Sequence, residues 1–460
     1  MSHATDFDPD LIQRYDRNGP RYTSYPTAAQ FLPFTADDHR QAATRANAAH
    51  PEAPLSVYVH VPFCASPCFY CGCNRVISRD PGRPARYLSR LLREIDLQAA
   101  LFQGRRVIEQ LHFGGGTPTH FSDDQLATVI AALRSRFGFV RSARREFSIE
   151  IDPRTVDGGR LATLRELGFN RLSLGVQDVD PEVQAAINRV QSTEHLRALM
   201  AVARDIGFQS LSMDLIYGLP RQTPERFART LDLVVATAPD RVALYGYAHL
   251  PAQFRAQRMI QASALPDAEA RLALLQFAVR RLTDAGYVHI GMDHFARPDD
   301  GLAQAVRARR LQRNFQGYST RAGLDLLGLG VSAISRMGDA YSQNARRLRD
   351  YEALIDVGQL PTERGRRLSA EDRLRATVIE HLMCGRTVHL DRLAEQFGID
   401  PRQHFASALA ALASAERDQL VRLRPQRIDV MPRGRYLLRA LAMPFDAYLA
   451  PAGATGSRVV

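Results

Sequence analysis

The residues Cys64-Ala-Ser-Pro-Cys68-Phe-Tyr-Cys71-Gly-Cys73 bring four of the chain's five cysteines within ten positions. They follow an apolar, β-branched segment at 55–60 that predicts a strand. The first three cysteines have the spacing C-x3-C-x2-C. Three thiolates on one short loop can hold three corners of a 4Fe–4S cluster and leave its fourth iron open to a small molecule. This stretch therefore predicts an iron–sulfur site at the end of a strand.

Two other uses of these cysteines must be weighed. Zinc prefers four nitrogen or sulfur ligands, typically from two separate pairs, and only Cys384 lies outside the loop. Disulfides are typical of small secreted chains. This chain has 460 residues, an odd number of cysteines and a polar N-terminus unlike a secretory signal. The cluster is the favoured interpretation, with zinc or inert thiols as the alternative.

The composition restricts the kinds of function that are possible. With 45% hydrophobic and 24% charged residues, the chain should fold into one large domain and one or two smaller ones. No stretch approaches the roughly 20 apolar residues that span a bilayer, which favours a cytoplasmic location. All 60 cationic residues are arginine, so Schiff-base and P-loop lysines are excluded.

The arginines are spread along the chain among 49 acidic residues, with no basic block. Arginine pairs in a bidentate manner with carboxylate or phosphate. A small polycarboxylate substrate is therefore at least as natural a partner as nucleic acid.

Short apolar runs alternate with helical segments over the first 300 residues. Strands are predicted at 55–60, 107–113, 146–151, 170–177, 210–216 and 242–248, with a seventh at 287–290. Helices are predicted at 84–101, 122–137, 158–167, 193–206, 224–236 and 266–285. Alternation at roughly 25–50 residues predicts βαβ units and a parallel sheet. Six units fit a partial (β/α) barrel, and a doubly wound sheet is the alternative.

Polar motifs stand at the C-terminal ends of the predicted strands, where barrels and open α/β sheets place their active sites. Gly114-Gly-Gly-Thr-Pro-Thr119 follows the second strand and lacks the spacing of a P-loop. Glu150 and Asp214 lie inside otherwise apolar strands, so each should meet an arginine or a cationic or hydroxyl-bearing ligand. Arg154, Arg171 and Arg189 are available for such pairing.

We divide the chain into five parts. These are an N-terminal arm (1–50), a barrel (51–300), a connecting and substrate-covering region (301–368), a mainly α-helical, winged-helix-like C-terminal domain (369–450) and a disordered tail (451–460). The last domain is expected to begin at a helix-capping box, Ser369-Ala-Glu-Asp372.

At this point the chain resembles the oxygen-independent coproporphyrinogen III oxidases, radical S-adenosylmethionine (SAM) enzymes of haem biosynthesis. Besides the cysteines, the matching motifs are Arg21-Tyr-Thr-Ser-Tyr-Pro-Thr27, Tyr58-Val-His-Val-Pro-Phe63, His112-Phe-Gly-Gly-Gly-Thr-Pro-Thr119, Ser148-Ile-Glu-Ile-Asp-Pro-Arg154, Gly175-Val-Gln-Asp178, Asp214-Leu-Ile-Tyr-Gly-Leu-Pro220, Tyr247-Ala-His-Leu-Pro251, Met292-Asp-His-Phe295, Asn314-Phe-Gln-Gly-Tyr318 and Gly330-Val-Ser-Ala-Ile334. The resemblance covers nearly the whole chain.

The resemblance implies a role for particular residues. Cys64, Cys68 and Cys71 would ligate the cluster, and Cys73 would matter for activity without ligating it. The family's two SAM molecules would be contacted by Tyr58, Tyr70, Gly115, Gly116, Thr117, Glu150, Gln177, Arg189, Asp214, Ala248 and Ile334. A related haem-binding group usually has Phe at the fourth cysteine and lacks the arm motif, so Cys73 and residues 21–27 favour the oxidase.

The implied reaction starts when a low-potential donor, such as flavodoxin or ferredoxin, reduces the cluster. SAM then yields a 5′-deoxyadenosyl radical that abstracts hydrogen from a propionate of coproporphyrinogen III. Loss of CO2 and an electron to an unidentified acceptor leaves a vinyl group, and two such steps give protoporphyrinogen IX. We expect a monomer without a membrane span or nucleic-acid partner. A haem-trafficking protein and a radical SAM methyltransferase are the alternatives.

Overall fold

The computed structural model describes residues 7–102, 104, 106–142 and 145–449. Six neighbouring parallel strands form its centre. They are β2 (Leu55–Val61), β5 (Ile108–Gly115), β6 (Glu146–Ile151), β7 (Arg171–Gln177), β8 (Ser210–Tyr217) and β9 (Arg241–Gly246). Because they neighbour one another in chain order, without the reversal of a doubly wound sheet, the partial-barrel prediction is confirmed.

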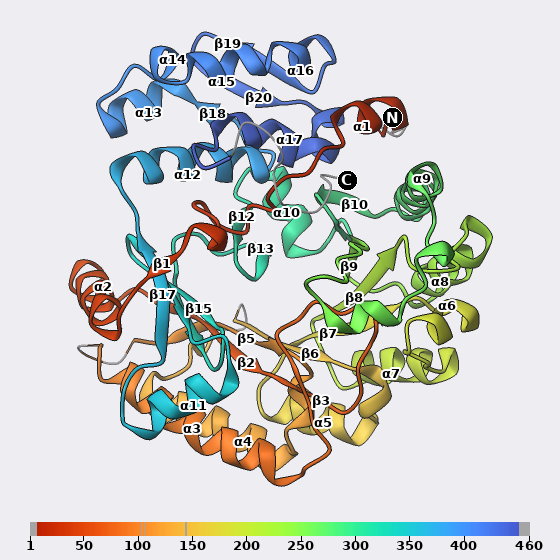
Figure 1. Ribbon diagram of the computed structural model, residues 1–460, viewed down its shortest axis with the longest axis vertical. Helices are drawn as coiled ribbons and strands as arrows, with labels where there is room; N and C mark the ends of the chain where they lie inside the picture. The colour runs from red at the N-terminus through yellow and green to blue at the C-terminus, as the bar shows by residue number, and fades with distance from the viewer. Residues whose placement is uncertain (1–6, 103, 105, 143–144, 450–460) are drawn as a thin grey trace.

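Helices connect the strands and cover the outer face of the sheet, as Figure 1 shows for the lower half of the molecule. They are α3 (Gly82–Ala99), α4 (Asp123–Arg136), α5 (Gly158–Glu166), α6 (Pro181–Ala186), α7 (Thr193–Asp205), α8 (Pro224–Thr237) and α9 (Ala268–Asp284). Local caps set where they begin: Ser122 and Gln125 form a capping box at α4, and Asp267 accepts from the Ala270 N–H at α9.

The side chains of the parallel strands differ between their two faces. In β6, Phe147, Ile149 and Ile151 are buried, whereas Ser148 and Glu150 are partly exposed between them. Strands covered on both faces are usually apolar throughout. The alternation shows that the inner face of this sheet surrounds a polar interior.

The sheet does not close and extends on both sides to thirteen strands. Beyond β2 come β14 (Asp325–Leu329), β15 (Ile334–Met337), β16 (Ala340–Asn344), β17 (Thr362–Arg367) and β1 (Leu32–Pro33); beyond β9 come β11 (His294–Ala296) and β10 (Val288–Gly291). The predicted seventh strand is therefore β10, but it pairs antiparallel with β11 at an edge. The additional parallel strand is β14, next to β2.

The C-terminal domain is mainly helical, as predicted, and lies above the sheet in Figure 1. It contains α12 (Ala370–Met383), α13 (Leu390–Phe397), α14 (Pro401–His404), α15 (Ala406–Ala411), α16 (Ala413–Arg417) and α17 (Leu438–Ala442), with strands β18 (Val388–His389), β19 (Val421–Arg424) and β20 (Arg427–Val430). The capping box of Ser369 and Asp372 is present at α12. The predicted tail lies outside the described residues.

The N-terminal arm joins the two parts. Its helix α1 (Pro9–Tyr15) reaches the C-terminal domain, where Arg14 pairs with Asp418 at 2.9 Å. The Tyr22 hydroxyl donates to Asp446 at 3.0 Å. Helix α2 (Ala36–Ala49) instead packs on β15, β16 and β17. No helix among the described residues is long and apolar enough to cross a membrane.

Candidate active site

A cavity of about 620 Å³ lies at the C-terminal ends of the parallel strands. Its wall contains the cysteine loop, the glycine turn after β5, and polar side chains from β6, β7 and β8. The sequence-predicted residues that line it are Cys64, Cys68, Tyr70, Cys71, Cys73, Gly115, Gly116, Thr117, Glu150, Gln177, Arg189 and Asp214. The structure thus brings together residues that lie up to 150 positions apart in the sequence.

The three cysteines of the C-x3-C-x2-C motif lie on one short loop that lines the cavity. Cys64 ends the short strand β3 (Phe63–Cys64), which pairs with β4 (Val76–Ile77), and its Sγ lies 3.4 Å from Thr117 Oγ1. Within the described ranges, no three His, Cys, Asp or Glu side chains are close enough together to hold one metal ion. Three thiols on one loop can hold three corners of a 4Fe–4S cluster.

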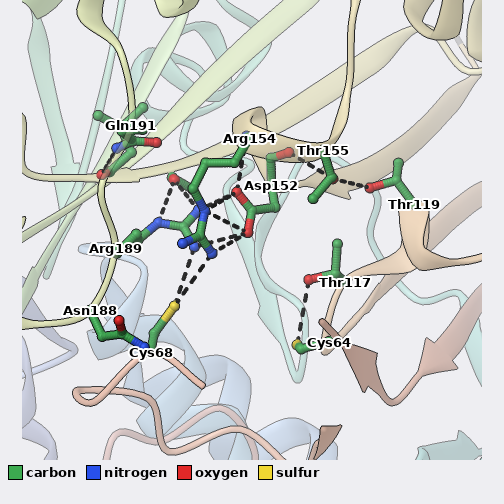
Figure 2. Close-up of polar contacts among 12 residues, drawn as sticks. Cys64, Cys68, Thr117, Thr119, Asp152, Arg154, Thr155, Asn188, Arg189 and Gln191 are labelled. Carbon is green, nitrogen blue, oxygen red and sulfur yellow. Dashed lines mark hydrogen bonds and ion pairs between the residues drawn. The ribbon is translucent and has the colours of Figure 1, made fainter. Parts of the chain in front are cut away.

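Two arginines lie beside the thiol of Cys68, as Figure 2 shows. Arg189 Nη1 is 3.5 Å and Arg154 Nη2 is 3.7 Å from Cys68 Sγ. Asp152 holds both guanidinium groups, at 3.2 Å from Arg189 and 2.6 Å from Arg154. Burial alone would raise the pKa of Asp152, but the bonds and charges of these arginines lower it. The two arginines therefore place positive charge beside the sulfur of Cys68.

Glu150 and Asp214 have no arginine partner among the residues that the structure describes. Glu150 accepts from His112 at 3.1 Å and from the Gly115 N–H at 3.2 Å, while Ser173 Oγ lies 3.3 Å from Asp214. Burial and the charge of Glu150 raise the pKa of Asp214 to about 7. Both carboxylates therefore suit a cationic or hydroxyl-bearing ligand.

The arginine pairing considered for these two acids is wrong. Arg154 and Arg189 pair with Asp152, and Arg171 pairs with Glu146 at 3.3 Å. Asp152 was missed as a site residue, although it lies only two residues after Glu150 in the sequence. An acid flanked by an arginine at the end of a strand was the available signal.

Glycines bring the end of β5 close to the loop after β2. A Cβ on Gly115, where φ is +119°, would lie 2.7 Å from the ring of His60. A Cβ on Gly116 would lie 2.7 Å from the Pro62 carbonyl. These positions need glycine for packing within the protein as well as for ligand approach.

A second cavity, of about 250 Å³, adjoins the first through Glu150, which lines both. It contains two further predicted residues, Tyr58 and Ile334. Phe315 and Gln316 also line it and were missed as site residues, although the Asn314-Phe-Gln-Gly-Tyr318 motif was recognised. The Nε2 of Gln316 is buried without a partner.

Ala248 lines neither of these two cavities. Its carbonyl accepts from Gln257 Nε2 at 3.1 Å, and the same nitrogen donates to the Tyr70 carbonyl at 2.9 Å. The structure therefore connects Ala248 to the cysteine loop through Gln257.

Cys73 lies in the first cavity beside Cys71. Its backbone N–H is 3.4 Å from Cys71 Sγ. The hydrogen bond from the Cys73 thiol lowers the pKa of Cys71 to about 6 and raises that of Cys73 itself. Cys384 is buried in the C-terminal domain, in keeping with a packing role.

Comparisons with known proteins agree with this site. Residues 58–234 match the model of the radical SAM superfamily, and residues 368–437 match the model of the HemN C-terminal domain. The cysteine motif, the partial barrel and the cavity at its C-terminal edge define a radical SAM protein.

Similarity to individual proteins is more specific. The chain is 49% identical to an oxygen-independent coproporphyrinogen III oxidase of Pseudomonas aeruginosa and 47% identical to that of Escherichia coli K12, with 96% of each chain covered. The solved structure of coproporphyrinogen III oxidase (HemN) from Escherichia coli, described as a radical SAM enzyme, superposes with a TM-score of 0.90 and 45% identity, over 96% of this chain and 99% of that one. The chain belongs to the oxygen-independent coproporphyrinogen III oxidase family.

Proposed function

We propose that this protein oxidatively decarboxylates two propionate side chains of coproporphyrinogen III to vinyl groups, giving protoporphyrinogen IX in anaerobic haem biosynthesis. The observation that carries this proposal is similarity at 47–49% identity over 96% of the chain, including the arm and the C-terminal domain. The site supports the same reaction, because its thiols and polar cavities suit the reagents that such chemistry requires.

A 4Fe–4S cluster on Cys64, Cys68 and Cys71 fits the structure. The three thiols line one wall of the larger cavity, and Arg189 and Arg154 place positive charge beside one of them. When bound, the cluster and SAM supply one-electron chemistry that removes a hydrogen atom from carbon.

The two adjoining cavities support the binding of two SAM molecules. In the larger one, Glu150 and Asp214 present carboxylates that can hold an ammonium group or ribose hydroxyls. In the smaller one, Glu150 is joined by Tyr58 and Ile334, which offer an aromatic and an aliphatic surface.

We propose that the Cys73 thiol acts in the reaction of the substrate and does not ligate the cluster. With three ligands on the loop and the fourth iron reserved for SAM, its thiol is left for another task. Its hydrogen bond with Cys71 connects that thiol to the ligand loop. We further propose a cytoplasmic enzyme that takes electrons from a low-potential flavodoxin or ferredoxin.

The test is an anaerobic reaction with SAM, dithionite and coproporphyrinogen III, followed by mass spectrometry. The proposal predicts successive products that have each lost CO2 and two hydrogens. SAM cleavage without any vinyl product would favour a haem-binding relative, and a gain of methyl groups would indicate a methyltransferase. Either result would overturn the proposed function.

A further inference from the structure

A third cavity, of about 380 Å³, lies between the sheet, the N-terminal arm and helix α12 of the C-terminal domain. Strands β12 (Gln312–Asn314) and β13 (Gly317–Ser319) form a hairpin beside it, seen between the sheet and α12 in Figure 1. Phe315 and Leu326 line both this cavity and the smaller SAM cavity, so the two adjoin. Its volume is within the range of small-molecule sites.

Two arginines in the wall of this cavity form no ion pair within 4.0 Å in the described part of the chain. Arg313 is only 9% exposed; its Nε donates to the Tyr22 carbonyl at 3.3 Å, but its Nη1 is buried with no partner. Arg336 lies over the ring of Tyr341, 5.8 Å from its centroid, and the charges of Glu380 and Asp325 act on it without a direct ion pair. A buried guanidinium without an anion is costly.

The acidic side chains in the same wall are already paired. Asp325 accepts from Arg106 Nη1 at 2.9 Å, and Glu380 lies 3.5 Å from Arg386 Nη2. A third arginine of the wall, Arg321, pairs with Glu109 at 2.8 Å. The unmatched charge in the cavity is therefore positive.

We infer that Arg313 and Arg336 bind a carboxylate, and specifically a propionate of the porphyrinogen that is not being decarboxylated. This inference rests on the proposed function. Arginine binds carboxylates through paired, charge-assisted hydrogen bonds. A tetrapyrrole whose reacting propionate lies at the SAM cavities can reach an adjoining cavity with another propionate.

The methionine carboxylate of a SAM molecule has the same chemistry, so the test must separate the two ligands. Arg336→Gln keeps a polar side chain, although a shorter one, and removes its charge. Binding of coproporphyrinogen III is measured by anaerobic ultrafiltration without reductant, so that no turnover occurs, and free ligand is quantified after oxidation to the fluorescent porphyrin. SAM binding is measured in parallel.

The matched control is Arg364→Gln. Arg364 also lies over an aromatic ring, 5.7 Å from the centroid of Phe31, but its Nε donates to Gln343 and it does not line the cavity. Thermal melting of both variants checks that they are folded. Arg313→Gln, which also loses the bond to Tyr22, serves as a second variant.

The inference predicts that Arg336→Gln raises the Kd of coproporphyrinogen III about tenfold or more, while the Kd of SAM and both constants of the control stay unchanged. Arg336→Lys should recover part of the affinity. Unchanged porphyrinogen binding in both cavity variants, or a loss confined to SAM, would overturn the inference. Failure of the unsubstituted protein to bind or convert the porphyrinogen would instead refute the proposed function.

Discussion

At the scale of single residues, substitutions in the cysteine loop should distinguish the cysteines that ligate the cluster from the cysteine that is needed only for turnover. Cys73→Ser should retain the absorbance of the cluster but lose nearly all vinyl product, because Cys73 is not needed as a fourth corner. Cys71→Ser should lose the absorbance itself. Visible spectroscopy after anaerobic reconstitution, with iron analysis and the decarboxylation assay, compares the two. A cluster lost equally in both variants would contradict the assignment of three ligands.

Glu94 is a buried carboxylate that supports the site from outside it. It accepts from the Gly330 N–H at 2.7 Å, from Asn344 at 2.6 Å and from the Tyr351 hydroxyl at 2.7 Å. These bonds hold the turn that leads to Ile334. Burial raises the pKa of Glu94 to about 7.

This raised pKa predicts how stability changes with pH. Between pH 4.5 and about 7 the folded protein holds a proton on Glu94 that the unfolded chain releases, so this contribution to stability falls as pH rises. In the unsubstituted protein, the free energy of unfolding should fall by up to about 3 kcal/mol from this group over that pH range. Glu94→Gln should abolish this fall. Urea unfolding at several pH values checks this.

The control for that experiment is Glu352→Gln, a partly exposed position near Arg90. Its pH profile should follow that of the unsubstituted protein. If Glu94→Gln also shows the unaltered profile, Glu94 does not titrate in this range in the folded protein.

Site residues could be predicted from the sequence where a residue type in its local pattern has few possible functions. The cysteine spacing and the acids within apolar strands were such cases, and the structure places them around one cavity. The ion-pair partners of the arginines could not be predicted. A long arginine side chain can contact several acids, and the folded geometry decides which of them is nearest. Asp152, rather than Glu150, forms ion pairs with both Arg154 and Arg189.

At the scale of elements, the end of β5 tests whether close strand packing maintains the site. Gly115→Ala would force a Cβ to 2.7 Å from His60 at a positive φ. We expect a loss of more than about 2 kcal/mol of stability and weaker SAM binding. Gly286→Ala is the control: its φ is +86° and nothing lies within 4 Å of the added Cβ, so only backbone strain should be seen. Equal thermal shifts in the two variants would refute the packing argument.

The docked arm makes a second prediction at this scale. Arg439 donates to the Pro20 carbonyl at 2.9 Å and also to the Gly19 carbonyl, and Tyr22 and Tyr25 are buried. Arg439→Gln should free the arm and speed chymotrypsin cleavage after these tyrosines several-fold, whereas the exposed Arg402→Gln should not. Cleavage at the same rate in both would show that other contacts hold the arm.

Strands could be predicted from the sequence where helices cover them. The six parallel strands bury one apolar face beneath these helices, and each strand was predicted within two residues at either end. Strands β14 to β17 were missed. β17 reads Thr362-Glu-Arg-Gly-Arg-Arg367, and β15 and β16 also contain polar residues, because antiparallel strands at the side of the sheet need no continuous apolar face.

At the scale of the whole molecule, three cavities adjoin one another from the cysteine loop to the C-terminal domain. Glu150 lines the first two, and Phe315 and Leu326 line the last two. On the proposed function, this arrangement would hold the cluster, SAM and a polycarboxylate substrate along one interior. The central claim is that this interior brings SAM directly to a substrate propionate.

The most direct measurement uses coproporphyrinogen III deuterated at the β-carbons of its propionates. Under anaerobic turnover, 5′-deoxyadenosine should contain one deuterium for each vinyl group formed, as read by mass spectrometry. Vinyl product accompanied by unlabelled 5′-deoxyadenosine would contradict the account, because the hydrogen would then leave the substrate by another route.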